Sequence, residues 1–421
     1  MKKLLALSAA LLNIGAVQAE TLSLSYIGQQ IVESGRNYSG TTVGGLSGID
    51  YNAATGRYLA ISDDRSALNP ARFYELSLDI SKFQRSATAN SAGVSFNAVT
   101  TILKADGSTF GTNQVDPESL RLDAARNRIY WTNEGQRAAA GFQDPTVRSM
   151  NLDGSYAGEF TVPDRFKPAG SIGGASTGDR GIYNNLAFES LTLSKDGKTL
   201  WTATENALSQ DDLPATVNNG SNSRLLSFDL NSGKAGAEYV YQVAPVVLPP
   251  VPGQFATNGL TDLIAVGDRQ FIAIERSFGV GAATPGVAAT TDGKPTGNTI
   301  RLYYADARQA TDVSGLDSLA GQSFTAVSKE LLLDLSTLKN DDGSTLALDN
   351  IEGITLGPVI DGKQTLVLVS DNNFGASQFT QFVALSVNAP VPEPESYALL
   401  LAGLGLLGLV ARNKRMHARK A

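Results

Sequence analysis

Acidic side chains recur in this chain within short, similar units. The five units are Ser47-Gly48-Ile49-Asp50, Pro117-Glu118-Ser119-Leu120, Phe188-Glu189-Ser190-Leu191, Leu260-Thr261-Asp262-Leu263 and Ile351-Glu352-Gly353-Ile354. Their acidic positions, 50, 118, 189, 262 and 352, are 68, 71, 73 and 90 residues apart. Self-similarity at a long period is typical of repeat architectures. The spacing therefore predicts a ring of carboxylates.

A second acidic position follows the next predicted strand of each unit. These strands end in Ser62-Asp63-Asp64-Arg65, Thr132-Asn133-Glu134, Thr204-Glu205-Asn206, Ile274-Glu275-Arg276 and Ser370-Asp371-Asn372-Asn373. In an antiparallel pair, the start of one strand and the end of the next lie at the same end. We therefore expect about ten acidic side chains on one face, around a central channel.

Clustered carboxylates repel one another, so they either take up protons or bind cations. The only histidine is His417, close to the C-terminal end, and the chain has no cysteine. These counts exclude a Ser-His-Asp triad, a Cys-His pair and a histidine-containing zinc site in the central part of the chain. Oxygen ligands remain, and they favour Ca²⁺. Calcium can polarise phosphoryl oxygens and lower the pKa of a bound water.

Arginines near the predicted face would attract a phosphate ester, because a guanidinium group binds phosphate oxygens in pairs. The alternative is that the acids pair with arginines of neighbouring blades and only stabilise the fold. The acids outnumber the nearby arginines, which favours cation binding for the set. We predict catalytic residues Glu189 and Glu205, phosphate-binding residues Arg65, Arg180, Arg224 and Arg276, and metal-binding residues Asp50, Asp64, Glu118, Glu134, Glu352 and Asp371.

The elements that position these residues follow the same order in each unit. In the third unit, strands are predicted over 190–193, 199–204, 225–230 and 237–243, with an Asp-Gly turn at 196–197. The fifth unit has only three, and the alternating segment 22–27 can supply the fourth, which would close the ring. The predicted fold is an all-β single propeller with five four-stranded blades. Six blades stay an alternative, because residues 281–297 could hold further strands.

The N-terminal segment has the features of an export signal. Lys2 and Lys3 precede an apolar stretch over 4–17, and Val17-Gln18-Ala19 offers small residues for cleavage. We predict a signal peptide over residues 1–19, with a buried helix as the alternative.

The C-terminal segment combines three features in a fixed order. Val391-Pro392-Glu393-Pro394 is followed by an apolar run over 397–411 and by a basic tail. This order resembles the PEP-CTERM sorting signal of Gram-negative bacteria, which implies processing by an exosortase. A plain membrane anchor is the alternative. We expect a propeller domain over 20–390 and a sorting signal over 391–421, whose helix anchors the chain transiently in the inner membrane. The expected location is the cell envelope, the outer surface or the extracellular matrix.

The net charge of the central part bears on its partners. The two terminal segments hold seven of the 34 Lys and Arg residues and two of the 41 Asp and Glu residues. The remaining 27 basic and 39 acidic residues give a net charge of −12, against −7 for the whole chain. This balance excludes nucleic acid, which needs clustered basic residues, and suits divalent cations. We expect a monomer.

Several motifs resemble the esterase-like phytase family, also called phytase-like domain proteins. They are Gly44 to Asp50 with Leu59 to Arg65, Asp116 to Leu120, Arg180 to Leu191, and Asn350 to Ile354 with Leu366 to Phe374. The resemblance covers about residues 40 to 388. It implies an exported propeller with phosphoester or ester hydrolysis, and by fold analogy a calcium-loaded one. The chain departs from the pattern at Ser190, where Gly is expected, and has few lysines that could clamp inositol phosphates.

Three functions are consistent with these features. The first is a calcium-dependent phosphoric ester hydrolase acting on a small phosphoester. The second is a non-catalytic, calcium-stabilised propeller that binds exopolysaccharide or another surface partner. The third is a calcium-dependent lactonase or carboxylesterase, which lacks the histidine that some propeller lactonases use.

Overall fold

The computed structural model describes residues 22–286 and 294–388. The predicted signal peptide (1–19) and sorting signal (391–421) lie outside these residues. Residues Leu24–Val387 form one compact unit. Among the described residues no helix is long and apolar enough to cross a membrane, and the predicted span over 397–411 is not among them.

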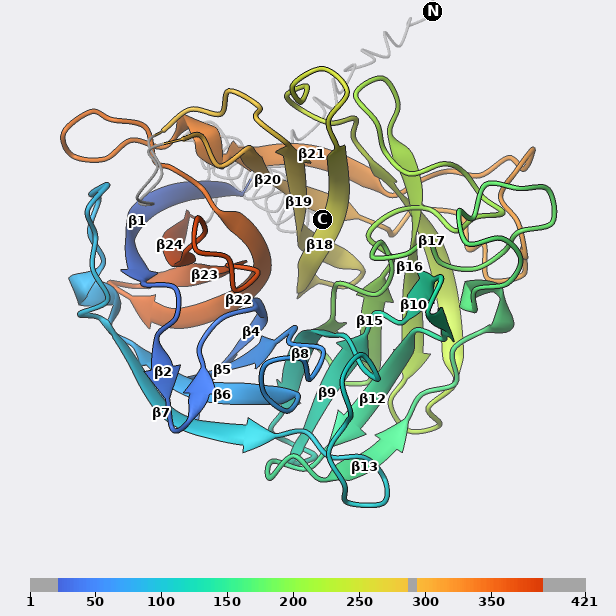
Figure 1. Cartoon of the computed structure of the whole chain (residues 1–421), viewed down its shortest axis with the longest axis horizontal. Helices are drawn as coiled ribbons and strands as arrows, with labels where there is room; N and C mark the ends of the chain where they lie inside the picture. Colours follow the sequence, from blue (N-terminus) through green and yellow to red (C-terminus); the bar gives the residue numbers. More distant parts are fainter. Residues whose placement is uncertain (1–21, 287–293, 389–421) are drawn as a thin grey trace, which may run out of the picture. The chain divides into compact units, whose positions relative to one another are not determined.

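Five four-stranded antiparallel sheets make up the described unit, so the chain is a five-bladed β-propeller (Figure 1). Blade 1 is β4 (Leu46–Asn52), β5 (Arg57–Ser62), β6 (Arg72–Leu78) and β7 (Val94–Thr101). Blade 2 is β8 (Pro117–Asp123), β9 (Arg128–Asn133), β12 (Thr146–Met150) and β13 (Tyr156–Glu159). Blade 3 is β14 (Thr192–Leu193), β15 (Thr199–Ala203), β16 (Ser221–Asp229) and β17 (Ala235–Val243).

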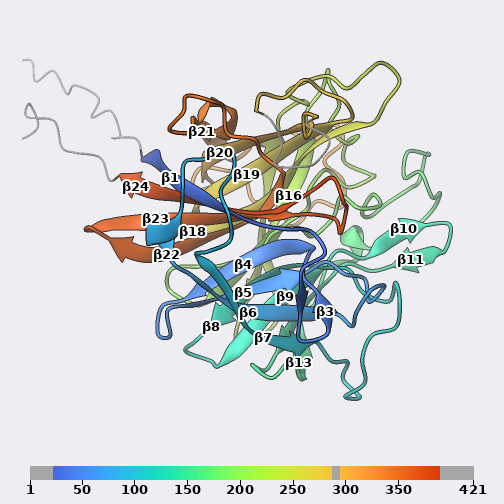
Figure 2. The same cartoon turned by 60° about the vertical axis from the view of Figure 1, so that its left-hand side comes forward.

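Blade 4 is β18 (Ala256–Gly267), β19 (Gln270–Gly279), β20 (Asn298–Asp306) and β21 (Ser328–Asp334). Blade 5 is β22 (Asn350–Ile360), β23 (Lys363–Asp371), β24 (Thr380–Asn388) and β1 (Ser23–Val32). The N-terminal strand thus completes the last blade, as the sequence predicted, and Figure 2 shows β1 beside β24. This closure covers the sheet edge that an open ring would expose.

Smaller elements lie between the blade strands. Two hairpins are formed by β2 (Asn37–Tyr38) with β3 (Thr41–Thr42), and by β10 (Gln136–Ala138) with β11 (Gly141–Gln143). Three 3₁₀ turns are η1 (Ile80–Lys82), η2 (Asp164–Phe166) and η3 (Leu335–Thr337). Within the described ranges there is no sixth blade, so five is the correct count.

The apolar core lies between adjacent blades. Between blades 1 and 2, Ile61 and Phe73 pack with Leu120 and Trp131 in one buried cluster. Between blades 3 and 4, the Trp201 ring stacks on Tyr239 and meets Phe271 edge to face, with centroids 5.8 and 5.7 Å apart. Each blade therefore buries its two faces against its neighbours, and this packing fixes the inner strands around the channel.

A buried ion pair fills the channel between the inner strands. The Arg121 guanidinium donates to both carboxylate oxygens of Asp262 at 3.0 and 2.8 Å, and to carbonyl groups of Ile49 and Ile354. Asp262 also accepts from the backbone N–H groups of Leu191 and Ile354. This single pair therefore bonds to the inner strands or first segments of all five blades.

Candidate functional site

The five blades are best aligned by the residues that pair between their first two strands. The acidic residues alone do not align them correctly. The paired residues Leu46 with Ser62, Pro117 with Asn133, Phe188 with Thr204, Leu260 with Glu275, and Ile351 with Ser370 are equivalent in the five blades. After this pair, the first strand of each blade contains one more residue than the strand opposite, which makes a β-bulge. The bulged positions 47, 118, 189, 261 and 352 are 71, 71, 72 and 91 residues apart.

These bulges aim one set of side chains at the mouth of the channel. The set is Ser47, Glu118, Glu189, Thr261 and Glu352. The residue after each second partner forms the other set, which is Asp63, Glu134, Glu205, Arg276 and Asp371. The N–H groups of Asp63, Glu134 and Glu205 donate across the blade to the carbonyls of Gly45, Asp116 and Ala187 at 2.8, 2.9 and 2.6 Å. Both sets thus lie at one end of the blades, as predicted.

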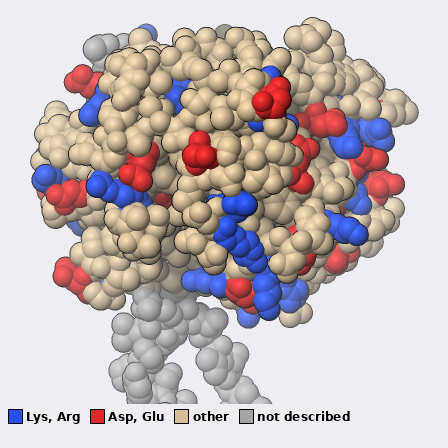
Figure 3. All heavy atoms as spheres, turned by 90° about the horizontal axis from the view of Figure 1, so that it is seen from below, with Lys and Arg blue, Asp and Glu red and all other residues tan. Residues whose placement is uncertain are grey.

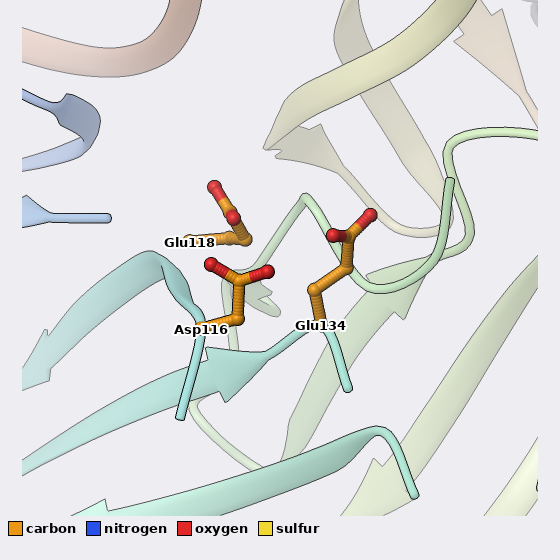
Figure 4. Close-up of side chains that lie close together, drawn as sticks. All are labelled: Asp116, Glu118 and Glu134. Atoms are coloured by element: carbon orange, nitrogen blue, oxygen red, sulfur yellow. The ribbon is translucent and has the colours of Figure 1, made fainter. Parts of the chain in front are cut away.

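Together with Asp116, these residues form what we call the carboxylate ring. Its members are Asp63, Asp116, Glu118, Glu134, Glu189, Glu205, Glu352 and Asp371. All are buried except Asp63, which is half-buried. The carboxyl groups of Asp116, just before β8, Glu118, on β8, and Glu134, just after β9, lie close together (Figure 4). By contrast, charged side chains of both signs are scattered over the outer face drawn in Figure 3.

Two of the predicted metal ligands lie elsewhere. Asp50 is three residues beyond the bulge of its blade, where it accepts from the Leu122 N–H at 2.8 Å and from the Thr355 hydroxyl at 3.1 Å. Asp64 follows Asp63 and turns away from the ring, and its carboxylate pairs with the buried Arg72 guanidinium at 2.7 Å. The structure brings neither carboxylate to the ring.

Two of the predicted phosphate-binding arginines are also remote from the ring. Arg224 is fully buried in blade 3, where it pairs with Asp211 at 2.6 Å and with Glu238 at 2.9 Å. Arg180 is exposed and its backbone pairs with Ala169. Glu275, which follows the predicted pattern of acidic strand ends, instead accepts from Tyr241, Asn258 and Lys329 within blades 3 and 4.

The other two arginines reach the ring. Arg65 approaches Asp116 at 2.5 Å and donates to the Asn185 side chain at 2.6 Å. Arg276 lies 3.2 Å from Glu205 and 3.1 Å from Glu352. Its Nε is buried and has no hydrogen-bond partner among the described residues. Eight carboxyl groups thus face two guanidinium groups, which leaves a large excess of acid in a buried volume.

This excess raises the pKa values of the ring carboxyls. Burial, with the nearby Asp116 and Glu352 carboxylates, raises the pKa of Asp63 to about 8. Burial raises the pKa of Glu205 to about 7 and that of Asp116 to about 6, although Arg276 and Arg65 oppose these shifts. For Glu118, Glu134, Glu189 and Asp371, burial and carboxylate neighbours hold the pKa well above the usual range. Without a cation, the ring therefore retains protons at neutral pH.

Two groups of ring carboxylates are close enough to hold a metal ion. In each of the groups Asp116, Glu118, Glu134 and Glu134, Glu189, Glu205, one oxygen per residue lies within 4.8 Å of the others. Oε2 of Glu134, the residue that both groups share, is buried without a hydrogen-bond partner in the described part of the chain. An oxygen-only donor set with an unpaired carboxylate oxygen fits a hard divalent cation such as Ca²⁺.

A cleft of about 620 Å³ opens beside the ring. Arg276, Glu352 and Asp349 line its charged part, and burial raises the pKa of Asp349 to about 6. The cleft is large enough for a small organic ligand. Arg276 lines the cleft and also pairs with the ring, so it lies between the two.

Asp63 and Asp116 are the ring members that we did not predict as site residues. Asp63 could have been found by aligning the five units on the last residue of the second strand. In this alignment Asp63, Glu134, Glu205 and Asp371 each directly follow a Ser, Asn or Thr. Because successive strand residues point to opposite sides, choosing Asp64 in place of its neighbour selected the wrong side of the blade.

Comparison with known families agrees with this architecture. A family model described as phytase-like, with the esterase-like activity of phytase, matches residues 41–374. The chain belongs to this family. A PEP-CTERM protein-sorting motif matches residues 390–415, which indicates an exported protein of a Gram-negative bacterium and implies processing by an exosortase. Both resemblances inferred from the sequence are thus confirmed, and no curated protein matches the chain.

Several solved structures are similar to the chain at low sequence identity. A protein of unknown function from Dyadobacter fermentans is 12% identical, with 87% of this chain and 100% of that chain covered and a TM-score of 0.38. The periplasmic gluconolactonase of Pseudomonas aeruginosa is 10% identical, with 88% and 100% covered and a TM-score of 0.35. An exo-β-1,3-galactanase from Clostridium thermocellum is 10% identical, with 86% and 64% covered and a TM-score of 0.42. These likenesses say nothing about activity.

Proposed function

We propose that the chain is an exported, calcium-dependent phosphoric ester hydrolase whose active site is the carboxylate ring. The observation that carries this proposal is the buried group Asp116, Glu118 and Glu134 beside Arg65, with Arg276 on the other ring members Glu205 and Glu352. Acids that only stabilised the fold would be paired one to one, as Asp64 is with Arg72. The ring instead holds eight carboxyl groups against two guanidinium groups.

Asp116, Glu118 and Glu134 would hold the cation, and Arg276 would bind the phosphoryl oxygens. Bound calcium would supply charge neutralisation of the phosphoryl group and a more acidic water. Arg276 lines the cleft, and its pairs with Glu205 and Glu352 fix the guanidinium in place there. Metal binding by Glu352 and Asp371 stays a prediction, and in this proposal they complete the ring.

Glu205 and Glu189 would move the protons. With a pKa of about 7, Glu205 is partly ionised at neutral pH and can accept a proton from the attacking water. Burial and its carboxylate neighbours hold the pKa of Glu189 well above the usual range, so Glu189 can donate a proton to the departing alcohol oxygen. Water adds to phosphorus as the ester P–O bond breaks, which yields the free alcohol and inorganic phosphate.

The test is phosphate release by the purified full chain from p-nitrophenyl phosphate, with calcium and then with a chelator. We expect turnover that is lost on chelation and restored by added calcium. The Glu134→Gln variant should lose it, whereas Glu159→Gln should not, because Glu159 lies on the outer strand β13 and pairs with Arg148. Equal, negligible release with calcium and with chelator would refute the proposal.

The sorting motif supports a location in the cell envelope or at the outer surface. We propose that residues 1–19 are removed on export and that an exosortase removes the tail after residue 390. Fractionation of cells with and without the exosortase tests this. Retention of the full-length chain in the inner membrane of the exosortase-deficient cells is expected, and an unchanged distribution would contradict it. A monomer is expected on size-exclusion chromatography.

A further inference from the structure

The walls of the cleft beside the ring are mostly neutral and polar. Seven of its lining side chains are amides or hydroxyls, including Asn185, Thr296, Asn298, Asn350, Asn373 and Gln378. Among the described residues that line it, only Arg276, Lys294, Asp349 and Glu352 carry charge. Such walls offer hydrogen-bond donors and acceptors to an uncharged, polar group rather than cations to an anionic one.

One of these amides lacks a partner. Asn298, the first residue of β20, is only 3% exposed, and its Oδ1 makes no hydrogen bond among the described residues. A buried polar atom of this kind costs stability unless a ligand or water satisfies it. The neighbouring amides are already held in place: Asn350 donates to Glu352 at 2.9 Å and Gln378 donates to Asp349 at 3.2 Å. An acceptor in a fixed wall matches a hydroxyl donor, which an ionised phosphate lacks.

An apolar surface completes the cleft. Phe278 and Pro295 line it, and the Phe278 ring is backed by the exposed Phe255 at a centroid distance of 6.4 Å. Aliphatic C–H groups can pack on these surfaces while hydroxyls meet the amides opposite. A compact ligand with both kinds of surface, such as a sugar, suits this combination.

The charge balance argues against a ligand with many phosphates. Two arginines and even two divalent cations together contribute six positive charges against the eight carboxyl groups of the ring. Beyond these groups, the described lining of the cleft adds one acid, Asp349, and one base, Lys294. One phosphate monoester brings a charge of about −2, whereas a hexakisphosphate brings about −12. Direct contacts with the cation and Arg276 can offset the charge of a monoester, but not that of a hexakisphosphate.

We infer that the substrate class is a phosphate monoester of a neutral, hydroxyl-rich alcohol, with Asn298 as a residue that determines specificity. The phosphoryl group meets Arg276 and the ring, and the alcohol part occupies the amide-lined cleft. This inference rests on the proposed function and narrows it, because it excludes inositol hexakisphosphate as the preferred substrate.

The experiment compares three probes on the full chain with calcium: a hexose 1-phosphate, p-nitrophenyl phosphate and inositol hexakisphosphate. We expect kcat/KM for the hexose phosphate to exceed that for the hexakisphosphate at least tenfold. In Asn298→Ala, kcat/KM should fall about 3- to 10-fold more on the hexose phosphate than on p-nitrophenyl phosphate, because only the hexose loses a hydrogen bond to Asn298. Asn97→Ala, on the exposed part of β7, is the matched control. Thermal melting checks that both variants fold.

The outcomes separate this inference from the proposed function. Turnover with a preference for the hexakisphosphate, or an equal loss on both monoesters in Asn298→Ala, overturns the substrate class and leaves the hydrolase intact. Turnover of none of the three probes overturns both. In that case calorimetric binding of a free hexose would indicate the glycan-binding propeller instead.

Discussion

Glu134 gives the sharpest test of the ring, because its substitution should have opposite effects with and without calcium. Glu134→Gln removes one charge and keeps the shape of the side chain. Oε1 of Glu134 accepts from the Ala187 N–H at 2.8 Å, and the amide oxygen of Gln can keep this bond. The substitution therefore changes the electrostatics of the ring with little change in packing.

The expected magnitude follows from the distances in the ring. Two unit charges 4.8 Å apart, the limit within the two carboxylate groups, repel by about 3 kcal/mol at an effective dielectric constant of about 20. At pH 9 and without metal, removal of one acid from this crowded group should raise the free energy of unfolding by about 1–3 kcal/mol. With calcium, an affinity at least about tenfold weaker lowers the calcium-dependent stabilisation by about 1.4 kcal/mol or more.

Urea denaturation at pH 9, with calcium and with chelator, measures both effects, and Glu159→Gln provides the control with little expected change. The variant must be more stable than the parent without metal and must also gain less stability from calcium. A variant that is less stable than the parent without metal, or that gains as much stability from calcium as the parent does, would refute the account of the ring as a cation site.

Three further predictions concern the ring and the channel. In chelator, stability should fall as pH rises from about 4 to 8, since the folded state keeps protons that the unfolded state has lost; Asp63, for example, has its pKa raised from 3.8 to about 8. Urea denaturation at pH 5 and pH 8 checks this, and a rise would contradict it. Arg121→Met and Asp262→Asn should each cost about 3–5 kcal/mol of unfolding free energy, because each leaves a buried partner unpaired; a cost below about 1 kcal/mol would exclude the role of the pair in joining the blades. Arg276→Met should move the acidic limb of the pH–rate profile upward, because the guanidinium lowers the pKa of Glu205; an unmoved limb would show that Glu205 is not the base.

The sequence predicted the architecture because its signals are local. Alternating strands recur in each blade, and Asp-Gly turns join strands in blades 2, 3 and 5, such as the turn with Gly197 at a φ of 64°. The missing fourth strand of blade 5 also followed from the sequence, since a closed propeller leaves no edge strand. The number of blades followed once the long segment before Asn298 proved to hold no further strand in its described residues.

The composition of the ring was predicted less well, because it depends on strand register. A β-bulge adds one residue to a strand, and its place cannot be read from acidic residues alone. Thus Asp262, one residue past its bulge, points into the channel and binds Arg121, whereas the true ring position is Thr261. The bulge of blade 1 has one local signal, because Gly48 directly follows it. A Cβ on Gly48 would lie 2.7 Å from the Glu118 carbonyl oxygen, so no side chain fits there.

Arginine partners were the other source of error, because long side chains pair across segments that are distant in sequence. Arg224 was predicted to bind phosphate as one of the arginines near the face of the ring. In the structure it is held by Asp211 on a loop and by Glu238 on β17. Nothing in the local sequence distinguishes it from Arg276, which reaches Glu205 and Glu352 from blade 4.

Crystallography of the full chain with calcium and phosphate would locate the cation and the anion themselves. We expect anomalous difference density between Asp116, Glu118 and Glu134, and a phosphate within hydrogen-bond distance of Arg276. Clear density for the protein with no ion at this position, and ring carboxyls hydrogen-bonded only to one another and to Arg65 and Arg276, would contradict this expectation.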